Sequence, residues 1–146
     1  MIAVDTNILI YSLRDESPYY RQALTLMTSF AENRDPWAIP WPCVYEFLRV
    51  VTHPKFFIPP NTLEDALERI ERLRESPSLV MLGDGPGHLR HLLKTFRDSA
   101  AIGNLVHDAH IAALCLEHGV SEFYTMDRDF YRFPGLRVVY PFRNRG

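Results

Sequence analysis

Short apolar segments of strand length alternate along this sequence with longer segments that have helical periodicity. The strand candidates are residues 2–4, 37–41, 79–82, 123–125 and 137–140. Apolar residues recur every three or four positions in the segments between them, which are residues 8–13, 17–33, 42–53, 63–74, 88–97 and 104–118. Helical crossovers join parallel strands and must cover both faces of the sheet. The alternation therefore predicts an α/β sandwich around a mostly parallel five-stranded sheet.

Length and composition indicate one globular domain over residues 1–146. Of the 146 residues, 47% are apolar and 23% charged, which suits a single packed core. Cys43 and Cys115 are too few for a disulfide framework and stand in apolar runs, as buried thiols do. The sequence has neither a signal-peptide pattern nor an apolar run of membrane-spanning length. We therefore expect a cytoplasmic protein without membrane association.

Four acidic residues stand where the predicted strands end or where the neighbouring helices begin. Asp5 follows the first strand and Asp127 the fourth. Glu46 lies in the first turns of the helix after the second strand, and Asp108 in those of the helix before the fourth. If the first strand is central and the fourth is its neighbour, these side chains converge at one edge of the sheet. In open α/β sheets that edge carries the ligand site.

Asp108 is the most informative of these acids. The segment LVHDAHIAALCL, residues 105–116, contains no other formally charged residue, so we expect a helix that is buried on every side. An unpaired buried carboxylate is costly, and no Lys or Arg lies one turn away to neutralise it. A bound cation would supply the missing charge. The alternative is an exposed first-turn Asp that the helix dipole stabilises.

Each acid also has an ordinary structural explanation. Asp5 could cap the helix that follows it, and Glu46 could pair with Arg49 on the same helix. Asp127 and Asp129 could be turn residues that accept hydrogen bonds from their own backbone. Only the convergence of the acids favours a functional site.

A cluster of carboxylate oxygens suits Mg²⁺ or Mn²⁺, whereas zinc prefers His or Cys. The net charge of −2 means that a nucleic acid would be met by a local basic patch or through bound cations. Ions held in this way neutralise a scissile phosphate and activate water. The acids thus predict Mg²⁺-dependent hydrolysis of a phosphodiester.

Four separated motifs resemble the PIN-domain ribonucleases, in particular the VapC toxins of bacterial toxin–antitoxin pairs. They are VDTNILIY, PCVYEFLRVVTHP, GNLVHDAHIAALCLEHGV and YTMDRDFYRFPGL, in this order. The resemblance implies a PIN-like α/β/α sandwich and an endoribonuclease that depends on Mg²⁺ or Mn²⁺ and cuts RNA of the tRNA or rRNA class. It also implies a homodimer and a VapB-type antitoxin that blocks the site. The catalytic and metal-binding acids it implies are Asp5, Glu46, Asp108 and Asp127.

Further residues take supporting roles in this interpretation. Thr6, Asn7 and Thr125 fall where the family has polar residues that support the acids. For Asp129 we favour a structural role in the turn before Phe130 over assistance to a second metal ion. Candidate contacts to RNA phosphates or bases are Arg128, Arg132 and His110, with Arg137, Arg143 and Arg145 in the tail.

Two other functions remain open from the sequence. A haloacid-dehalogenase-like phosphatase or a receiver-type phospho-acceptor also places Asp at strand ends, and Asp84 could imitate a receiver's acceptor. Position 7 is Asn, however, and the only lysines are Lys55 and Lys94, away from the predicted strand ends. A non-catalytic acidic binding module is the other alternative. The histidine pairs at positions 88 and 91 and at 107 and 110 lack the rest of a zinc signature, so no zinc site is predicted.

Overall fold

The computed structural model describes residues 1–142 and confirms the five-stranded sheet. The strands lie in the order β3-β2-β1-β4-β5, and every neighbouring pair is parallel. Their bounds are β1 (Ile2–Val4), β2 (Trp37–Pro40), β3 (Leu79–Leu82), β4 (Glu122–Tyr124) and β5 (Val138–Val139). The central strand β1 therefore separates β2, its successor along the chain, from β4, which makes the β1–β4 boundary the switch point of the sheet.

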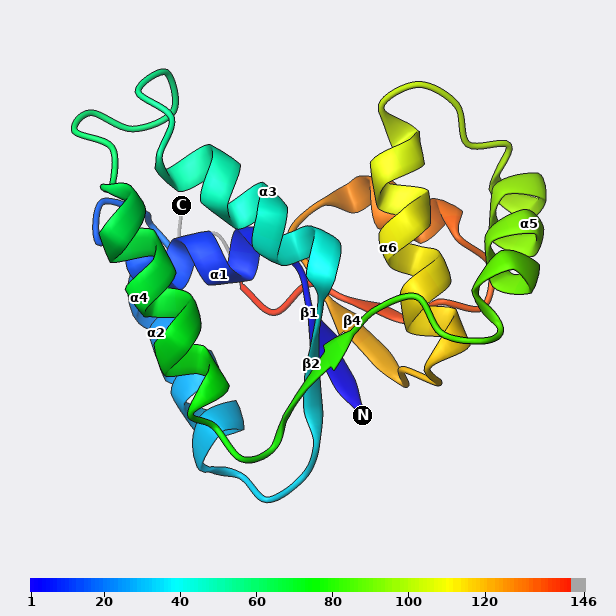
Figure 1. Ribbon diagram of the computed structural model, residues 1–146, viewed down its shortest axis with the longest axis horizontal. Helices are drawn as coiled ribbons and strands as arrows, with labels where there is room; N and C mark the ends of the chain where they lie inside the picture. Colours follow the sequence, from blue (N-terminus) through cyan, green and yellow to red (C-terminus); the bar gives the residue numbers. More distant parts are fainter. Residues whose placement is uncertain (143–146) are drawn as a thin grey trace.

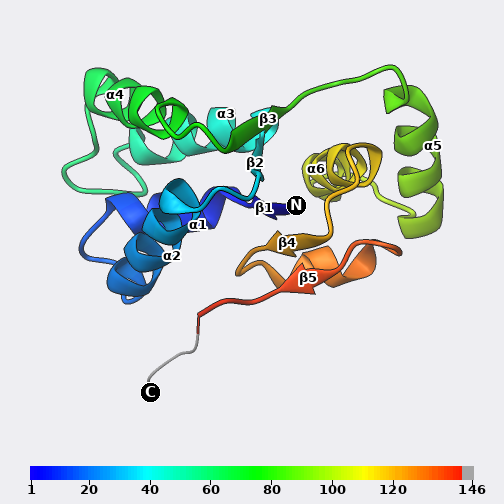
Figure 2. The same cartoon turned by 90° about the horizontal axis from the view of Figure 1, so that it is seen from below.

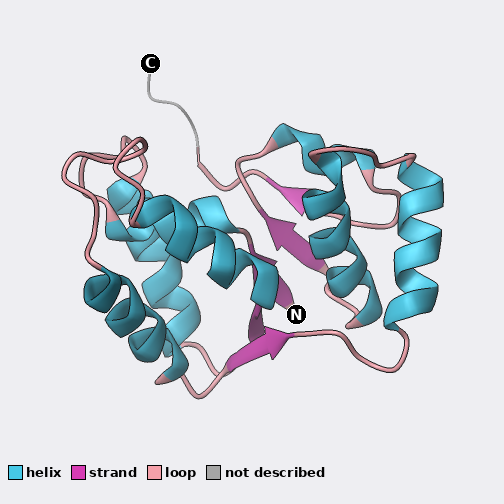
Figure 3. Cartoon of the chain, turned by 45° about the horizontal axis from the view of Figure 1, so that its top comes forward, coloured by secondary structure: helices cyan, strands magenta, loops and turns pink. Residues whose placement is uncertain are grey.

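Helices cover both sides of the sheet, as its parallel connections require. Helices α1 to α4 lie on one side, and α5 and α6 lie on the other (Figure 1, Figure 2). The helices are α1 (Thr6–Leu13), α2 (Tyr20–Glu32), α3 (Trp41–Val51), α4 (Leu63–Arg74), α5 (His88–Ser99) and α6 (Leu105–Glu117). A short 3₁₀ helix, η1 (Arg128–Arg132), joins β4 to β5. Figure 3 shows the strands enclosed between the two groups of helices.

The helix ends lie within two residues of the predicted ones, except at the start of the second helix. The second helix begins at Tyr20 and not at Ser17, because the Ser17 hydroxyl accepts the Tyr19 N–H at 3.1 Å and holds a turn there. Strand β2 ends at Pro40, and Trp41 already belongs to α3. Pro42 lies in the first turn of α3, where a missing N–H costs nothing.

The core fills the space between the sheet and both helical layers. Large side chains with less than 2% exposure include Trp37 of β2, Phe47 of α3, Phe123 of β4 and Phe130 of η1. Phe123 and Phe130 pack with ring centroids 4.8 Å apart, which fixes η1 beneath the end of β4. The segment after β4, which carries Asp127, is thereby anchored to the core. None of the helices among residues 1–142 has the length and apolarity to cross a membrane.

Candidate metal centre

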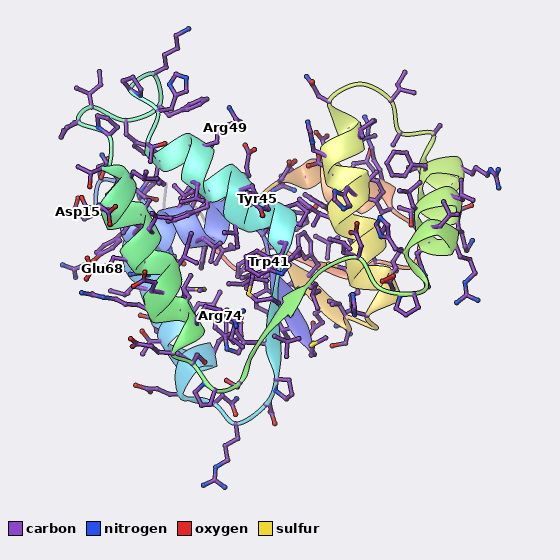
Figure 4. All side chains as sticks on the ribbon, viewed as in Figure 1. Asp15, Trp41, Tyr45, Arg49, Glu68 and Arg74 are labelled. Carbon is purple, nitrogen blue, oxygen red and sulfur yellow. The ribbon has the colours of Figure 1, made fainter. Side chains whose placement is uncertain are left out.

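A cleft of about 1180 Å³ opens at the carboxyl ends of β1 and β4. Helix α3 borders it on one side and α6 on the other, and Trp41, Tyr45 and Arg49 follow one another along α3 (Figure 4). All four predicted acids line this cleft, which are Asp5, Glu46, Asp108 and Asp127. The convergence inferred from the order of strands is therefore present in the structure.

Asp5 forms the floor of the site and is only 5% exposed. It caps α1, because its Oδ1 accepts the Thr6 N–H at 2.7 Å, and the Cys43 thiol donates to the same oxygen at 3.6 Å. Its Oδ2 accepts the Thr125 hydroxyl at 2.6 Å. Burial raises the pKa of Asp5, the Thr125 hydrogen bond opposes that shift, and the nearby Asp127 charge adds to it. The capping role and the site role thus belong to the same carboxylate.

Asn7 and Thr125 connect the floor of the site to the segment that carries Asp127. The Asn7 amide donates to Asp5 Oδ2 and to the Thr125 hydroxyl, both at 3.2 Å, and its Oδ1 accepts the Met126 N–H at 3.1 Å. Thr125 is fully buried, and its hydroxyl oxygen accepts the Asp127 N–H at 2.9 Å. These side chains set the spacing between Asp5 and Asp127.

Thr6 lines the cleft next to Asp5. Its side chain is buried and donates to the Cys43 carbonyl at 3.4 Å, which ties the start of α1 to α3. This hydrogen bond thus holds α1 against α3, one of the two helices that border the cleft.

Replacing Thr125 by Val is expected to lower the free energy of unfolding by about 2 kcal/mol. The near-isosteric change leaves a buried carboxylate oxygen without its hydroxyl donor, and hydrogen bonds to charged groups carry about 1.5–3 kcal/mol. Urea titration at pH 7.5 measures the effect. The control is Thr95→Val on α5, which replaces a hydroxyl that is similarly buried but lies away from the cleft. A loss for Thr125→Val no greater than that of the control would contradict the proposed support of Asp5.

Asp108 is less buried than the sequence predicts. Its helix α6 is not enclosed on every side: Val106 and His107 in the first turn are exposed, and continuous burial begins beyond His110. The prediction of a helix buried all round was therefore wrong for the first turn. The Asp108 carboxylate is half-buried at the wall of the cleft, and its pKa is raised to about 7.

The raised pKa of Asp108 has two physical causes. Desolvation contributes most, and repulsion from Asp127, Asp5, Asp129 and Glu46, in that order, contributes the rest. A carboxyl group that neighbouring acids hold partly protonated at neutral pH is stabilised in its charged form by a cation.

Three of the acids come close enough to share one ion. Carboxylate oxygens of Asp108, Asp127 and Asp129 all lie within 4.8 Å of one another. Asp127 caps η1, and its Oδ1 accepts the Asp129 N–H at 2.9 Å, so the turn role considered for Asp127 is also present. Asp129, for which the sequence favoured a purely structural role, contributes its own carboxylate to this cluster.

Glu46 lies at the edge of the site with a partner of its own. Its carboxylate is exposed and accepts two hydrogen bonds from Arg49, at 2.6 and 3.3 Å. Such an exposed pair, one turn apart on α3, contributes little and can open at small cost. Among residues 1–142, Glu46 is therefore the one predicted acid that pairs with a guanidinium.

The donor set fits a hard divalent cation. Asp108, Asp127 and Asp129 offer only carboxylate oxygens, which Mg²⁺ and Mn²⁺ prefer. Within residues 1–142, the ion pairs of Lys and Arg go to other acids and leave these three and Asp5 without a basic partner. The cluster thus has the charge and the ligand type that such an ion requires.

Three of the residues predicted to contact RNA lie on two elements, η1 and α6. Arg128 and Arg132 are exposed on η1 beside Asp127, and the Arg128 guanidinium lies over the Tyr140 ring, 5.2 Å from its centroid. His110 lines the cleft on α6. Arg143 and Arg145 lie outside the described residues.

One group of residues near the cleft has no counterpart in the sequence prediction. Ligand atoms of Asp84, His88 and His110 lie within 4.8 Å of one another. The sequence pairs His88 with His91 and His107 with His110 by helical spacing, whereas the structure pairs His88 of α5 with His110 of α6. That pairing depends on how α5 packs on α6, and spacing along one helix carries no signal of it.

Comparison with known proteins places this geometry in a family. The PIN domain profile matches residues 2–136. Ribonuclease VapC48 of Mycobacterium tuberculosis is 33% identical over 138 residues, which cover 94% of this chain and 95% of that protein. The similarity therefore extends over nearly the full length of both sequences.

Solved structures with lower identity share the fold. The VapC20 toxin of Mycobacterium tuberculosis, described as cleaving the sarcin–ricin loop, has a TM-score of 0.66 at 15% identity and covers 94% of this chain and 99% of its own. VapBC2 of Rickettsia felis, bound to a promoter DNA fragment, has a TM-score of 0.65 at 18% identity, with coverage of 95% and 98%. These similarities support the α/β/α sandwich over the whole matched length.

Proposed function

This chain belongs to the PIN domain family, and from that premise we propose that it is a Mg²⁺-dependent endoribonuclease, the toxin of a VapBC-type pair. The observation that carries the proposal is the cluster of Asp108, Asp127 and Asp129 above the buried Asp5, without a basic partner among residues 1–142. Clustered acids that have no ion pair and whose charges help to raise the pKa of Asp108 suit a divalent cation and a phosphate substrate.

The proposed roles follow from where each side chain lies. Asp108, Asp127 and Asp5 would hold Mg²⁺, or Mn²⁺ in its place, and Glu46 would join them when its Arg49 pair opens. Asp129 would assist from η1. The bound ion would neutralise the scissile phosphate and make water more acidic. Asn7, Thr6 and Thr125 keep the acids in position.

The cleft offers RNA more than its acids. Arg128 and Arg132 lie beside Asp127 and are free to contact phosphates that flank the cleavage site. His110 lies on the α6 wall of the cleft, and Trp41 and Tyr45 are exposed along α3 on the other wall, where bases could stack. A single-stranded segment of a tRNA or an rRNA suits such a groove.

Cleavage of RNA by the purified chain tests the proposal. With excess Mg²⁺ or Mn²⁺ at pH 7.5, we expect internal cuts in a pool of tRNA and rRNA fragments, and EDTA should abolish them. The control preparation carries Asp108→Asn and is purified identically, which excludes a contaminating nuclease. Equal cutting by both preparations, or cutting that persists in EDTA, would contradict the proposal.

An antitoxin partner follows from the same site. We propose a VapB-type protein that inserts a basic side chain among the acids and packs on the exposed Trp41 and Tyr45 of α3. A homodimer and a cytoplasmic location, where Cys43 and Cys115 would stay reduced, complete the proposal.

The alternative phosphatase or phospho-acceptor has less support. Lys94 forms a 2.6 Å ion pair with Asp98 on the exposed side of α5, and Asp84 lies beside two histidines. Asn7 holds the position where a dehalogenase-like enzyme needs its second Asp, and its amide bonds to Asp5. A purely binding acidic module would show no Mg²⁺ affinity, and calorimetric titration of the chain with Mg²⁺ would reveal this.

A further inference from the structure

A second group of potential metal ligands lies at the rim of the cleft, separate from the three aspartates. Asp84 comes from the loop after β3, His88 begins α5, and His110 lies on α6. Asp84 and His110 line the cleft, whereas His88 lies behind them and its side chain is only 18% exposed. The three residues therefore join three separate segments at one corner of the molecule.

The distances at this corner fit a shared ion better than hydrogen bonds. Asp84 Oδ1 lies 3.6 Å from His88 Nε2 and 3.5 Å from His110 Nε2. Both exceed the usual N–H···O length of about 2.7–3.2 Å. In a tetrahedral zinc site with Zn–N and Zn–O distances near 2.0–2.1 Å, ligand atoms stand roughly 3.4 Å apart. The carboxylate oxygen is thus at the spacing of two ligands around one ion.

An independent observation concerns unsatisfied polar atoms. Within residues 1–142, the buried side-chain atoms without a hydrogen-bond partner are His88 Nδ1 and Glu117 Oε2. Glu117 borders the same loop, since its Oε1 accepts the Gly85 N–H at 2.6 Å and a Cβ on Gly85 would collide with it. Unsatisfied buried groups in a native structure call for an explanation, and an ion or water is a common one.

A metal ion on Nε2 would fix the tautomer of His88, although it would not contact the unsatisfied Nδ1. An ion on Nε2 of His88 places the proton on Nδ1, which becomes a hydrogen-bond donor. Among residues 1–142, Glu117 Oε2 is a buried acceptor that has no donor. Imidazoles that bind metals commonly have a carboxylate on their other nitrogen. With the ion bound, Nδ1 and Oε2 would be a donor and an acceptor, but the structure contains no hydrogen bond between them, so the distances at Asp84, His88 and His110 carry the inference.

We propose that Asp84, His88 and His110 bind one Zn²⁺ ion that fastens the loop after β3 and the start of α5 to α6. Two imidazoles and one carboxylate match the ligand preference of zinc, whereas the all-oxygen cluster of aspartates matches Mg²⁺. The remaining ligand position is left for water. Zinc would thus fix one rim of the cleft from outside the proposed Mg²⁺ centre.

Zinc titration of the metal-free chain tests the proposal without any measurement of RNA cleavage. Isothermal titration calorimetry at pH 7.5 should show one equivalent bound with a dissociation constant on the order of 1 µM or tighter. Co²⁺ in the same position should give the visible absorption of a tetrahedral site. His88→Ala and His110→Ala should each weaken zinc binding at least about 100-fold.

Two matched variants locate the bound ion. His107→Ala removes an exposed histidine from the same helix, three residues before His110, and should leave zinc affinity within about twofold. The double variant Asp108→Asn/Asp129→Asn disables the aspartate cluster and should retain the tight equivalent. His88→Gln, with a circular dichroism spectrum matching the parent's, guards against a folding defect in His88→Ala.

The outcomes separate this proposal from the proposed nuclease function. Loss of tight zinc binding in the histidine variants alone supports the zinc site, whether or not the chain cuts RNA. Binding that survives both histidine variants, binding that the double aspartate variant abolishes, or no tight binding by the parent would each overturn it.

Discussion

Asp108→Asn is expected to reduce Mg²⁺-stimulated RNA cleavage at least about 100-fold. The amide is nearly isosteric with the carboxylate but carries no charge. The cluster with Asp127 and Asp129 therefore loses one of its three carboxylates, the one whose pKa is raised to about 7. Removal of a single electrostatic contact to a reacting group typically costs about 100- to 1,000-fold in rate. Initial rates of cleavage of a fluorescent RNA, measured under single turnover, give the comparison.

The fold should survive this substitution. Above pH 7 the ionised Asp108 opposes folding, because its pKa in the folded chain lies above the ordinary value of 3.8, and the penalty fades as the pH falls toward 4. At pH 7.5 without metal, Asp108→Asn should therefore be as stable as the parent or more stable by roughly 1 kcal/mol, a value reduced because the group is half-exposed. Undiminished cleavage, or lost cleavage together with an unfolded chain, would refute the assignment.

The second large effect is a pH dependence of Mg²⁺ binding. A carboxyl group with a pKa of about 7 must lose its proton before it can bind the ion. Affinity should then fall about tenfold per pH unit below 7 and level off above it, which amounts to roughly 25-fold between pH 7.5 and 5.5. The raised pKa of Asp5 acts in the same direction. Calorimetric titration across this range measures the slope.

Proton release gives a direct check on the same coupling. At pH 6, Mg²⁺ binding should release close to one proton, read from titrations in buffers of different ionisation enthalpy. Asp98→Asn provides the control, because Asp98 pairs with Lys94 on α5, and the released proton number should be unchanged. An affinity that is flat from pH 5.5 to 7.5 would contradict the role of Asp108.

Most of the fold could be predicted from the sequence, because local periodicity determines it. The strands and helices occur where apolar spacing places them, and parallel crossovers leave few arrangements of five strands. The order of β1 and β4, assumed in order to bring Asp5 and Asp127 together, is also the observed one. The motif similarity and the strand order both place the four predicted acids at the same edge of the sheet.

The features that could not be predicted from the sequence depend on contacts between segments far apart in the chain. The apolar letters of α6 predict burial all round, but Val106 and His107 in its first turn are exposed and Asp108 is half-exposed. The Asp129 carboxylate reaches the cluster through the geometry of η1, which a D-x-D pattern does not distinguish from a simple turn. Likewise, His88 meets His110 only because α5 packs on α6.

The Glu46 position illustrates an ambiguity that sequence and structure share. Its pair with Arg49 was the ordinary structural explanation, and the structure contains that pair. Yet Glu46 also lines the cleft and adds to the raised pKa of Asp108. An exposed pair one turn apart is weak enough to exchange its guanidinium for a metal ion, so both roles are compatible on energetic grounds.

The central claim is that acidic residues far apart in the sequence together bind a divalent cation. A crystal structure of the chain grown with Mn²⁺, with anomalous differences measured near the manganese edge, tests it most directly. We expect an anomalous peak at roughly 2.2 Å from carboxylate oxygens of Asp108 and Asp127. A map without a peak in the cleft, with each acid turned toward its own Arg or Lys, would contradict the claim.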